Sequence, residues 1–158
     1  RISDYTFSKC ISLTEIKIPG SIREIGYKSF SGCSGLREIS IPSTVKTVGI
    51  GAFENCTELK DISLPTTLTE INYYTFSGCT SLTTLTLHSK LTAINNYAFA
   101  GCKSLTEIHC KNSNPPLIGE NTFRDVNRIG CKIFVPSKRA KKSYSTALYW
   151  NEFTIYIE

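Results

Sequence analysis

Cysteine and histidine are the residues of this chain with the greatest capacity for chemistry. The sequence contains seven cysteines and two histidines. Thiolates can bind zinc, form disulfides or act as nucleophiles, and an imidazole can serve as a general base. Five of the cysteines recur at intervals of 23 residues, at Cys10, Cys33, Cys56, Cys79 and Cys102. Any role for them must therefore suit one cysteine in every structural repeat.

The regular spacing favours a structural role for these five thiols. No C-x-x-C pair occurs in the chain, and zinc sites are usually built from such pairs. Side chains stacked in parallel register point the same way, which is poor geometry for a disulfide. We expect a column of buried free cysteines, with no metal or other cofactor. A bridge between the remaining pair, Cys110 and Cys131, stays open as an alternative.

Neither histidine suggests a catalytic site. No residues near His88 or His109 in the sequence complete a triad, and the glycines form no phosphate-binding loop. We therefore predict that the chain is not an enzyme. His109 lies on the outward side of a predicted strand, so it is retained as a binding residue.

The elements that carry these residues are copies of one unit. A phenylalanine precedes each repeated cysteine by three residues and a leucine follows it by three. The phenylalanines are Phe7, Phe30, Phe53, Phe76 and Phe99, and the leucines are Leu13, Leu36, Leu59, Leu82 and Leu105. A fixed period of this length is typical of a solenoid, in which each coil buries its apolar face against the next.

The coil at residues 59–76 shows the expected elements. Leu59, Ile62 and Leu64 alternate with polar residues, which predicts a strand that ends at Pro65. A shorter strand follows, with Leu68 and Ile71 inward. Strands of successive coils would pair in parallel at about 4.8 Å and form a continuous sheet roughly 25–30 Å long. The predicted fold class is a β-rich, right-handed solenoid of 23-residue coils.

Two columns of glycine and asparagine predict the corners of each coil. One column is Gly26, Gly49, Asn72, Asn95 and Gly119. The other is Gly32, Asn55, Gly78 and Gly101, with Lys9 and Asp125 at the ends. Glycine and asparagine adopt positive φ at low cost, so we expect a left-handed residue at both corners.

The repeat resembles a known family. The pattern L-x-x-I-x-I-P-x-x-[LIV]-x-x-[IV]-[GN]-x-x-x-F-x-x-C runs from Leu13 through Cys102, and the likeness covers about residues 5–136. It is similar to the BspA-type (Treponema pallidum-like) leucine-rich repeats of bacterial surface proteins. His88 and Lys111 replace the proline, and an insertion at residues 112–116 adds one residue. The resemblance implies a secreted or cell-surface protein that adheres to host proteins or to other microbes.

The C-terminal residues are expected to cap the solenoid. Residues 133–136 predict a last strand and residues 137–149 a helix with Ser137 as N-cap. Trp150, Phe153, Ile155 and Ile157 would close the core, and this tail resembles family members from gut Bacteroidales. We assign residues 1–136 to the solenoid and 137–158 to a cap of the same domain. Residues 1–12 resemble an incomplete coil, so we expect further chain before Arg1.

Charge and hydropathy restrict the classes of partner that the chain could bind. The net charge of +5 includes four cations in one short segment, at Lys138, Arg139, Lys141 and Lys142. We interpret this segment as the solvated face of a cap helix, with contact to a polyanion as the alternative, and expect no nucleic-acid binding. No apolar run approaches the roughly 20 residues of a membrane-spanning helix.

Function is expected on the outward columns of the longer strands, because packing fixes the inward ones. The first column is Glu15, Glu38, Asp61, Thr84 and Glu107, and the second begins at Lys17 and ends at His109. A second exposed cluster would contain Tyr27, Tyr73, Tyr74 and Tyr97. We predict a monomeric, non-catalytic module that binds a host or microbial surface protein. A structural spacer and a glycan-binding module that uses the tyrosines are the alternatives.

Overall fold

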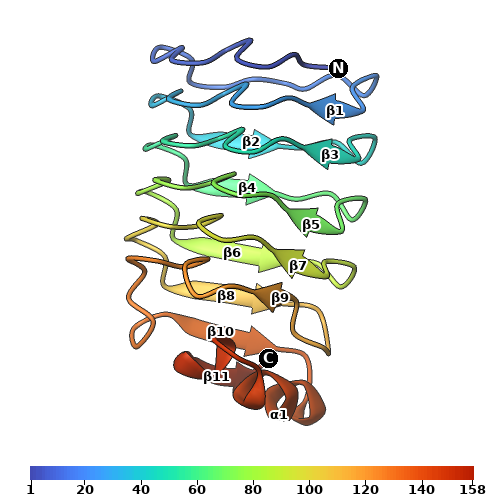
Figure 1. The fold of residues 1–158 in the computed structure, drawn as a ribbon, viewed down its shortest axis with the longest axis vertical. Coiled ribbons are helices and arrows are strands. Elements are labelled where there is room, and N and C mark those ends of the chain that lie inside the picture. The colour runs from blue at the N-terminus through green and yellow to red at the C-terminus, as the bar shows by residue number, and fades with distance from the viewer.

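A computed structural model describes residues 1–158 as a stack of coils with one helix near the C-terminal end (Figure 1). The longer strands are β2 (Glu38–Ser40), β4 (Asp61–Ser63), β6 (Thr84–Leu87), β8 (Glu107–Cys110), β10 (Lys132–Val135) and β11 (Thr154–Ile157). The shorter ones are β1 (Glu24–Ile25), β3 (Thr47–Val48), β5 (Glu70–Ile71), β7 (Ala93–Ile94) and β9 (Leu117–Ile118). The helices are α1 (Lys138–Thr146) and the 3-10 helix η1 (Trp150–Glu152). The solenoid predicted from the sequence is confirmed.

The four coils from β2 to β9 each have one longer and one shorter strand, and the strands that pair with their equivalents in a neighbouring coil do so in parallel. In β4, Ile62 is buried while Asp61 and Ser63 are exposed, as the alternation predicted. Register follows the repeat, because Glu38 pairs with Asp61 and Thr84 with Glu107. Equivalent side chains of successive coils therefore form straight columns, and a binding surface can extend along them.

The expected continuous sheet is not formed. The longer strands are divided into two sheets, and so are the shorter strands. The longer strands form the sheets β2-β4 and β6-β8-β10-β11, and the shorter ones form β1-β3 and β5-β7-β9. Between β3 and β5, side chains replace the ladder, since Asn72 Nδ2 donates to Val48 O over 2.8 Å and Thr67 Oγ1 to Val45 O over 2.6 Å. A void of about 10 Å³ beside Leu64 and Leu68 accompanies this boundary. Local packing there overrides the strict sequence period.

A ladder of phenylalanine rings forms the centre of the core. Successive rings from Phe7 to Phe123 stack with centroids 5.1–5.6 Å apart and interplanar angles of 14° or less. The rings from Phe30 to Phe123 are buried, whereas Phe7 is half-buried. Because one strict period places each ring on the previous one, the aromatic contacts repeat from coil to coil.

The cysteines form a second ladder of free thiols beside the rings. Cys33, Cys56, Cys79 and Cys102 are buried, and each Sγ donates to the carbonyl oxygen of a phenylalanine 26 residues earlier, over 3.0–3.5 Å. Cys10 is exposed. Cys110 and Cys131, the open pair, are also buried and free. Burial raises the pKa of Cys56 to about 12, so the thiol stays protonated and can donate.

One of the two corner predictions is confirmed and the other is wrong. Positive φ occurs at every member of the second column, including Lys9 and Asp125, with values from 58° to 75°. In the first column it occurs at none; after four of the five members positive φ falls two residues later instead, at Lys28, Gly51, Tyr74 and Tyr97. Close packing explains the first column, because a Cβ at Gly49 would lie 2.7 Å from the carbonyl carbon of Gly26. The asparagines at this position use their amides to bind the previous coil.

The cap is largely as predicted. Ser137 is the N-cap of α1, with its Oγ accepting from Ala140 N over 3.1 Å, but the helix ends at Thr146, three residues earlier than expected. Trp150 is buried and its Nε1 donates to Pro116 O over 2.8 Å. The last residues form β11, which joins the sheet of β10. Ile157 is 43% exposed, so it does not close the core as expected.

Candidate functional site

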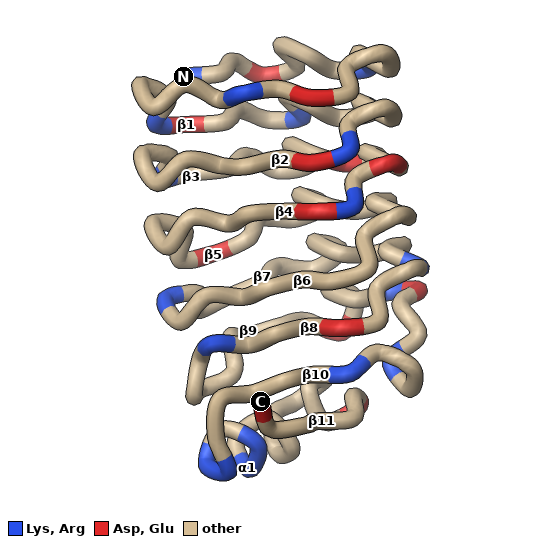
Figure 2. Tube along the Cα trace, turned by 180° about the vertical axis from the view of Figure 1, so that it is seen from behind, with Lys and Arg blue, Asp and Glu red and all other residues tan.

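The candidate site is the strand face, defined as the outward positions of β2, β4, β6 and β8 with the equivalent residues 15 and 17 of the first coil. Strand pairing places Glu38 beside Asp61 and Ser40 beside Ser63. It likewise places Thr84 beside Glu107 and Thr86 beside His109. The columns predicted from the sequence are therefore present on the paired strands. Figure 2 shows acidic residues at the starts of β2, β4 and β8.

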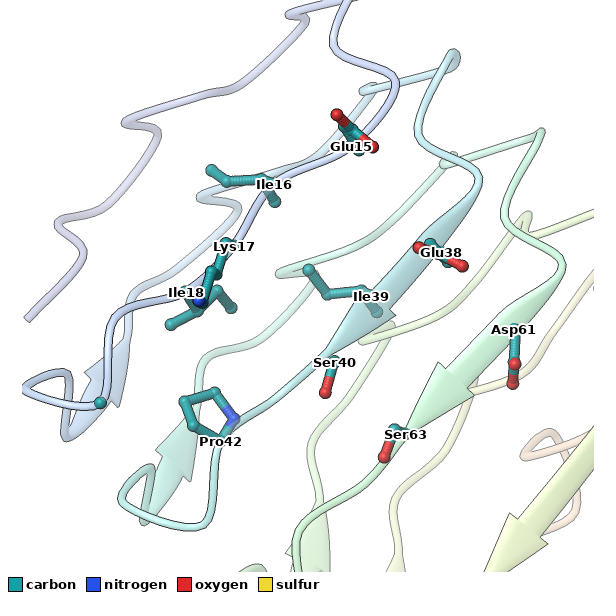
Figure 3. A pocket seen from close by; sticks show the side chains of 11 residues that line it. Glu15, Ile16, Lys17, Ile18, Glu38, Ile39, Ser40, Pro42, Asp61 and Ser63 are labelled. Atoms are coloured by element: carbon teal, nitrogen blue, oxygen red, sulfur yellow. The ribbon is translucent and has the colours of Figure 1, made fainter.

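A shallow groove of about 840 Å³ crosses the N-terminal part of the strand face. It is lined by Glu15, Lys17, Glu38, Ser40, Asp61 and Ser63, with Ile16, Ile18, Gly20, Ile39 and Pro42 between and beside them. Figure 3 shows the carboxylates of Glu15, Glu38 and Asp61 in one row and the serines Ser40 and Ser63 in the next. Four of the predicted binding residues thus line one groove.

The groove exists because residues 13–18 do not join the ladder of the longer strands, although β1 of the same coil pairs with β3. Residues 13–18 form no strand, and β2 pairs only with β4. The backbone contact from β2's segment to this part of the first coil is a single hydrogen bond, from Arg37 N to Thr14 O over 3.2 Å. The half-buried Ile16 is left between the two segments. Strand alternation identifies the polar residues of the groove from the sequence, but not its apolar part around Ile16.

The acidic residues of the groove have no ion-pair partner. No cation lies within 4.0 Å of the carboxylates of Glu15, Glu38 or Asp61, although Arg37 and Lys60 are neighbours in the chain. Exposed carboxylates one strand apart repel one another weakly. A cationic group placed over the row would remove that repulsion. The groove is therefore suited to a ligand that carries a positive charge and hydrogen-bond donors.

Three predicted residues of the strand face lie outside the groove. Thr84, Glu107 and His109 continue the columns on β6 and β8 but do not line the hollow. His109 is engaged with β10 and with the cap, since its ring stacks on Phe134 of β10 at 4.8 Å and its Nδ1 lies 2.5 Å from Glu158 Oε1 of the cap. Lys111 Nζ lies 2.5 Å from Glu158 Oε2, and these two partners lower the pKa of Glu158. This contact fastens the last residue to the sheet.

The predicted tyrosines lie at the corner after the short strands, but of the four only Tyr74 and Tyr97 contact one another. Tyr27, Tyr73 and Tyr74 are 38%, 44% and 38% exposed, and Tyr97 is half-buried. Tyr74 and Tyr97 stack on one another with centroids 4.9 Å apart. Tyr74 therefore has one ring face covered by its neighbour, while Tyr73 projects without an aromatic partner.

Other candidate chemistry is structural. Burial lowers the pKa of His88, and its Nδ1 accepts from Lys90 N over 3.3 Å. The structure holds no group of three or more His, Cys, Asp and Glu side chains placed to bind a metal ion. No helix has the length and apolar character needed to cross a bilayer.

Comparison with known proteins places these features in a family. The BspA type leucine rich repeat region matches residues 1–134 in six copies. No protein with a curated description matches the chain.

Several solved structures are similar. A leucine rich cell surface protein from Faecalibacterium prausnitzii has a TM-score of 0.70 and 30% identity over 84% of this chain and 35% of that one. A leucine-rich repeat protein from Bacteroides ovatus has a TM-score of 0.64 and 26% identity over 99% of this chain and 42% of that one. The T. pallidum leucine rich repeat protein has a TM-score of 0.65 and 31% identity over 68% of this chain and 50% of that one.

The chain thus spans half or less of the length of these solved chains. The match over residues 1–134, together with the coil stack and its phenylalanine and cysteine ladders, shows that the chain belongs to the BspA-type leucine-rich repeat family.

Proposed function

We propose that this chain is a non-catalytic recognition module, secreted or on the cell surface, that binds a protein partner through the groove of the strand face. One observation carries the proposal: three carboxylates without ion-pair partners gather with serine hydroxyls in one groove of about 840 Å³. An exposed lysine or arginine of a partner would fit over this row. The description of a similar structure as a cell surface protein supports the location.

The test is a binding screen against immobilised fibronectin, fibrinogen and laminin. The variant Glu38→Gln/Asp61→Asn removes two charges of the groove. The control Glu70→Gln/Glu120→Gln removes two exposed charges that lie outside the groove. Saturable binding that falls at least tenfold in the groove variant and is retained in the control would support the proposal. Equal binding by both variants would exclude the groove, and silence across the panel would favour a structural spacer.

A second candidate is a glycan-binding module at the tyrosine corner. The exposure of Tyr73 favours it, because a free aromatic face can stack on a sugar ring. A neutral glycan array compared between the native chain and Tyr73→Ala tests this candidate. Glycan binding lost in Tyr73→Ala, but kept in the groove variant, would place function at the corner rather than on the strand face.

A further inference from the structure

The cap helix carries a cationic surface that lies apart from the groove. Lys138, Arg139, Lys141 and Lys142 of α1 are all exposed, whereas Ala140 and Tyr144 are buried against the solenoid. Helical positions one, three and four residues apart place the four cations on one broad side, opposite the buried pair. Figure 2 shows this basic cluster on α1 at the end of the stack. We call these four residues the basic cap.

The basic cap has no internal counter-charge. None of its four side chains lies within 4.0 Å of a carboxylate. The two acidic residues of the segment 137–158 are engaged elsewhere, Glu152 with Arg128 and Glu158 with Lys111 and His109. All four positive charges are therefore available to an external partner.

The positions of the cations also oppose helix stability. The first turn of α1 holds no acidic residue, and Lys138 and Arg139 lie there instead. Positive charge near a helix N-terminus interacts unfavourably with the helix dipole. Ser137 caps the helix without help from these cations. Stability of the cap therefore gives no reason for cations in the first turn.

The other exposed residues of α1 indicate which class of polyanion would bind. Ser145 and Thr146, the other exposed residues of α1, are hydroxylic, and the apolar side of the helix is covered by the solenoid. A helix that binds lipid uses an exposed apolar face, whereas no exposed residue within α1 is apolar. The exposed large apolar side chains that follow it, Leu148, Tyr156 and Ile157, lie outside the helix. The basic cap also contains no aromatic residue on which a nucleic-acid base could stack.

We propose that the basic cap binds a linear anionic polysaccharide, with sulfate or carboxylate groups paired to Arg139 and the three lysines. Arginine can hold such groups with two hydrogen bonds, and the lysines add charge that salt can screen. The four cations account for most of the net charge of +5, so this end of the molecule dominates its attraction for polyanions. The site does not depend on the proposed function of the groove.

The test compares two triple variants of the full chain for heparin and polygalacturonate binding by calorimetry at 50 and 150 mM salt. Lys138→Gln/Lys141→Gln/Lys142→Gln removes charge from the basic cap. Lys46→Gln/Lys90→Gln/Lys103→Gln removes the same charge from exposed lysines of the coils. Vesicles of anionic phospholipid, a DNA duplex and neutral dextran are the comparison probes.

We expect at least one anionic polysaccharide to bind more weakly at higher salt, with affinity at least tenfold lower in the cap variant and within twofold of native in the coil variant. Replacement of the three cap lysines by arginine should retain binding. Equal losses in the two triple variants would show attraction to net charge only and overturn the proposal. So would absence of binding at 50 mM salt, or tighter binding of vesicles, duplex or dextran.

Discussion

The thiol of Cys56 donates a hydrogen bond to the carbonyl oxygen of Phe30, 26 residues earlier, over 3.3 Å between Sγ and O. The same contact recurs at Cys33, Cys79 and Cys102. Each of these carbonyl oxygens already accepts from a backbone N–H of its own coil, as Phe30 O does from Cys33 N, so the thiol adds a second donor from the next coil while it fills the core. The thiol contact and the packing together are a structural reason for cysteine at this position of each coil, and they require no redox or metal chemistry.

The phenylalanine ladder predicts a gradient of mutational cost along the stack. Phe53 is fully buried between Phe30 and Phe76, whereas Phe7 is half-buried and stacks on Phe30 alone. We expect Phe53→Ala to reduce the free energy of unfolding by about 3–5 kcal/mol, because it leaves a cavity. Phe7→Ala should reduce the free energy of unfolding by clearly less. Urea unfolding followed by circular dichroism gives both values, and equal costs would contradict the gradient.

Thiol reactivity should divide the cysteines into one fast site and six slow ones. Cys10 is exposed, while the other six are buried in the core or beneath the cap. Burial raises the pKa of Cys33 to about 11 and that of Cys102 to about 12. At pH 8 we expect a colorimetric thiol reagent to modify one equivalent rapidly in the native protein and seven after denaturation. Cys10→Ser should abolish the fast phase, and its persistence in that variant would contradict the assignment.

The same thiols predict a loss of stability at alkaline pH. A folded-state pKa of about 12 for Cys56 and Cys110, against 9.0 for a free thiol, means that the folded state holds protons which the unfolded chain releases. Their contribution is fully present below pH 9 and is lost as the pH rises toward 12, at about 1.4 kcal/mol per pH unit for each thiol. Burial also raises the pKa of the Cys79 thiol, so Cys56→Ala/Cys79→Ala should flatten the decline in the free energy of unfolding between pH 9 and pH 11. An unchanged slope in urea titrations would contradict this prediction.

Asp125 should be a site where glycine stabilises the fold. It has φ of 63° at the corner where three earlier coils have glycine. Left-handed backbone costs a residue with a Cβ about 1–2 kcal/mol, and the added chain entropy of glycine offsets about half of that. We expect Asp125→Gly to raise the free energy of unfolding by about 0.5 kcal/mol. Asp125→Ala, which keeps the Cβ, should not; a more stable alanine variant in thermal denaturation would contradict the argument.

Sequence periodicity predicted the coil, the strand alternation, the Phe and Cys columns and the Ser137 cap, because these depend on contacts repeated from coil to coil. It misassigned positive φ to Gly49 and Asn72, since glycine there reflects close approach of the previous coil rather than backbone conformation. It also missed the left-handed Tyr74, because tyrosine gives no signal for that region.

The candidate site was predictable only in part. The acidic column follows from alternation, and strand register confirms that Glu38 adjoins Asp61. The groove could not be predicted, because residues 13–18 have the same pattern as the longer strands of the later coils yet stay outside their ladder. The positive charge of α1 follows from the sequence. The ion pairs of Glu152 with Arg128 and of Glu158 with Lys111 are evident only from the structure.

The breaks in the two sets of strands are staggered, and this has a mechanical consequence. Ladder hydrogen bonds in a solenoid run along the stack, so tension between the two ends of the molecule would load them directly. The shorter strands break between β3 and β5, where the β2–β4 ladder and the stacked rings of Phe53 and Phe76 still join the coils. The longer strands break one coil later, between β4 and β6, where the β5–β7 ladder is intact. Each of these junctions therefore has one ladder, whereas β6–β8 and β7–β9 join the next two coils through both. Under load, the junctions with one ladder should open before the junction with two.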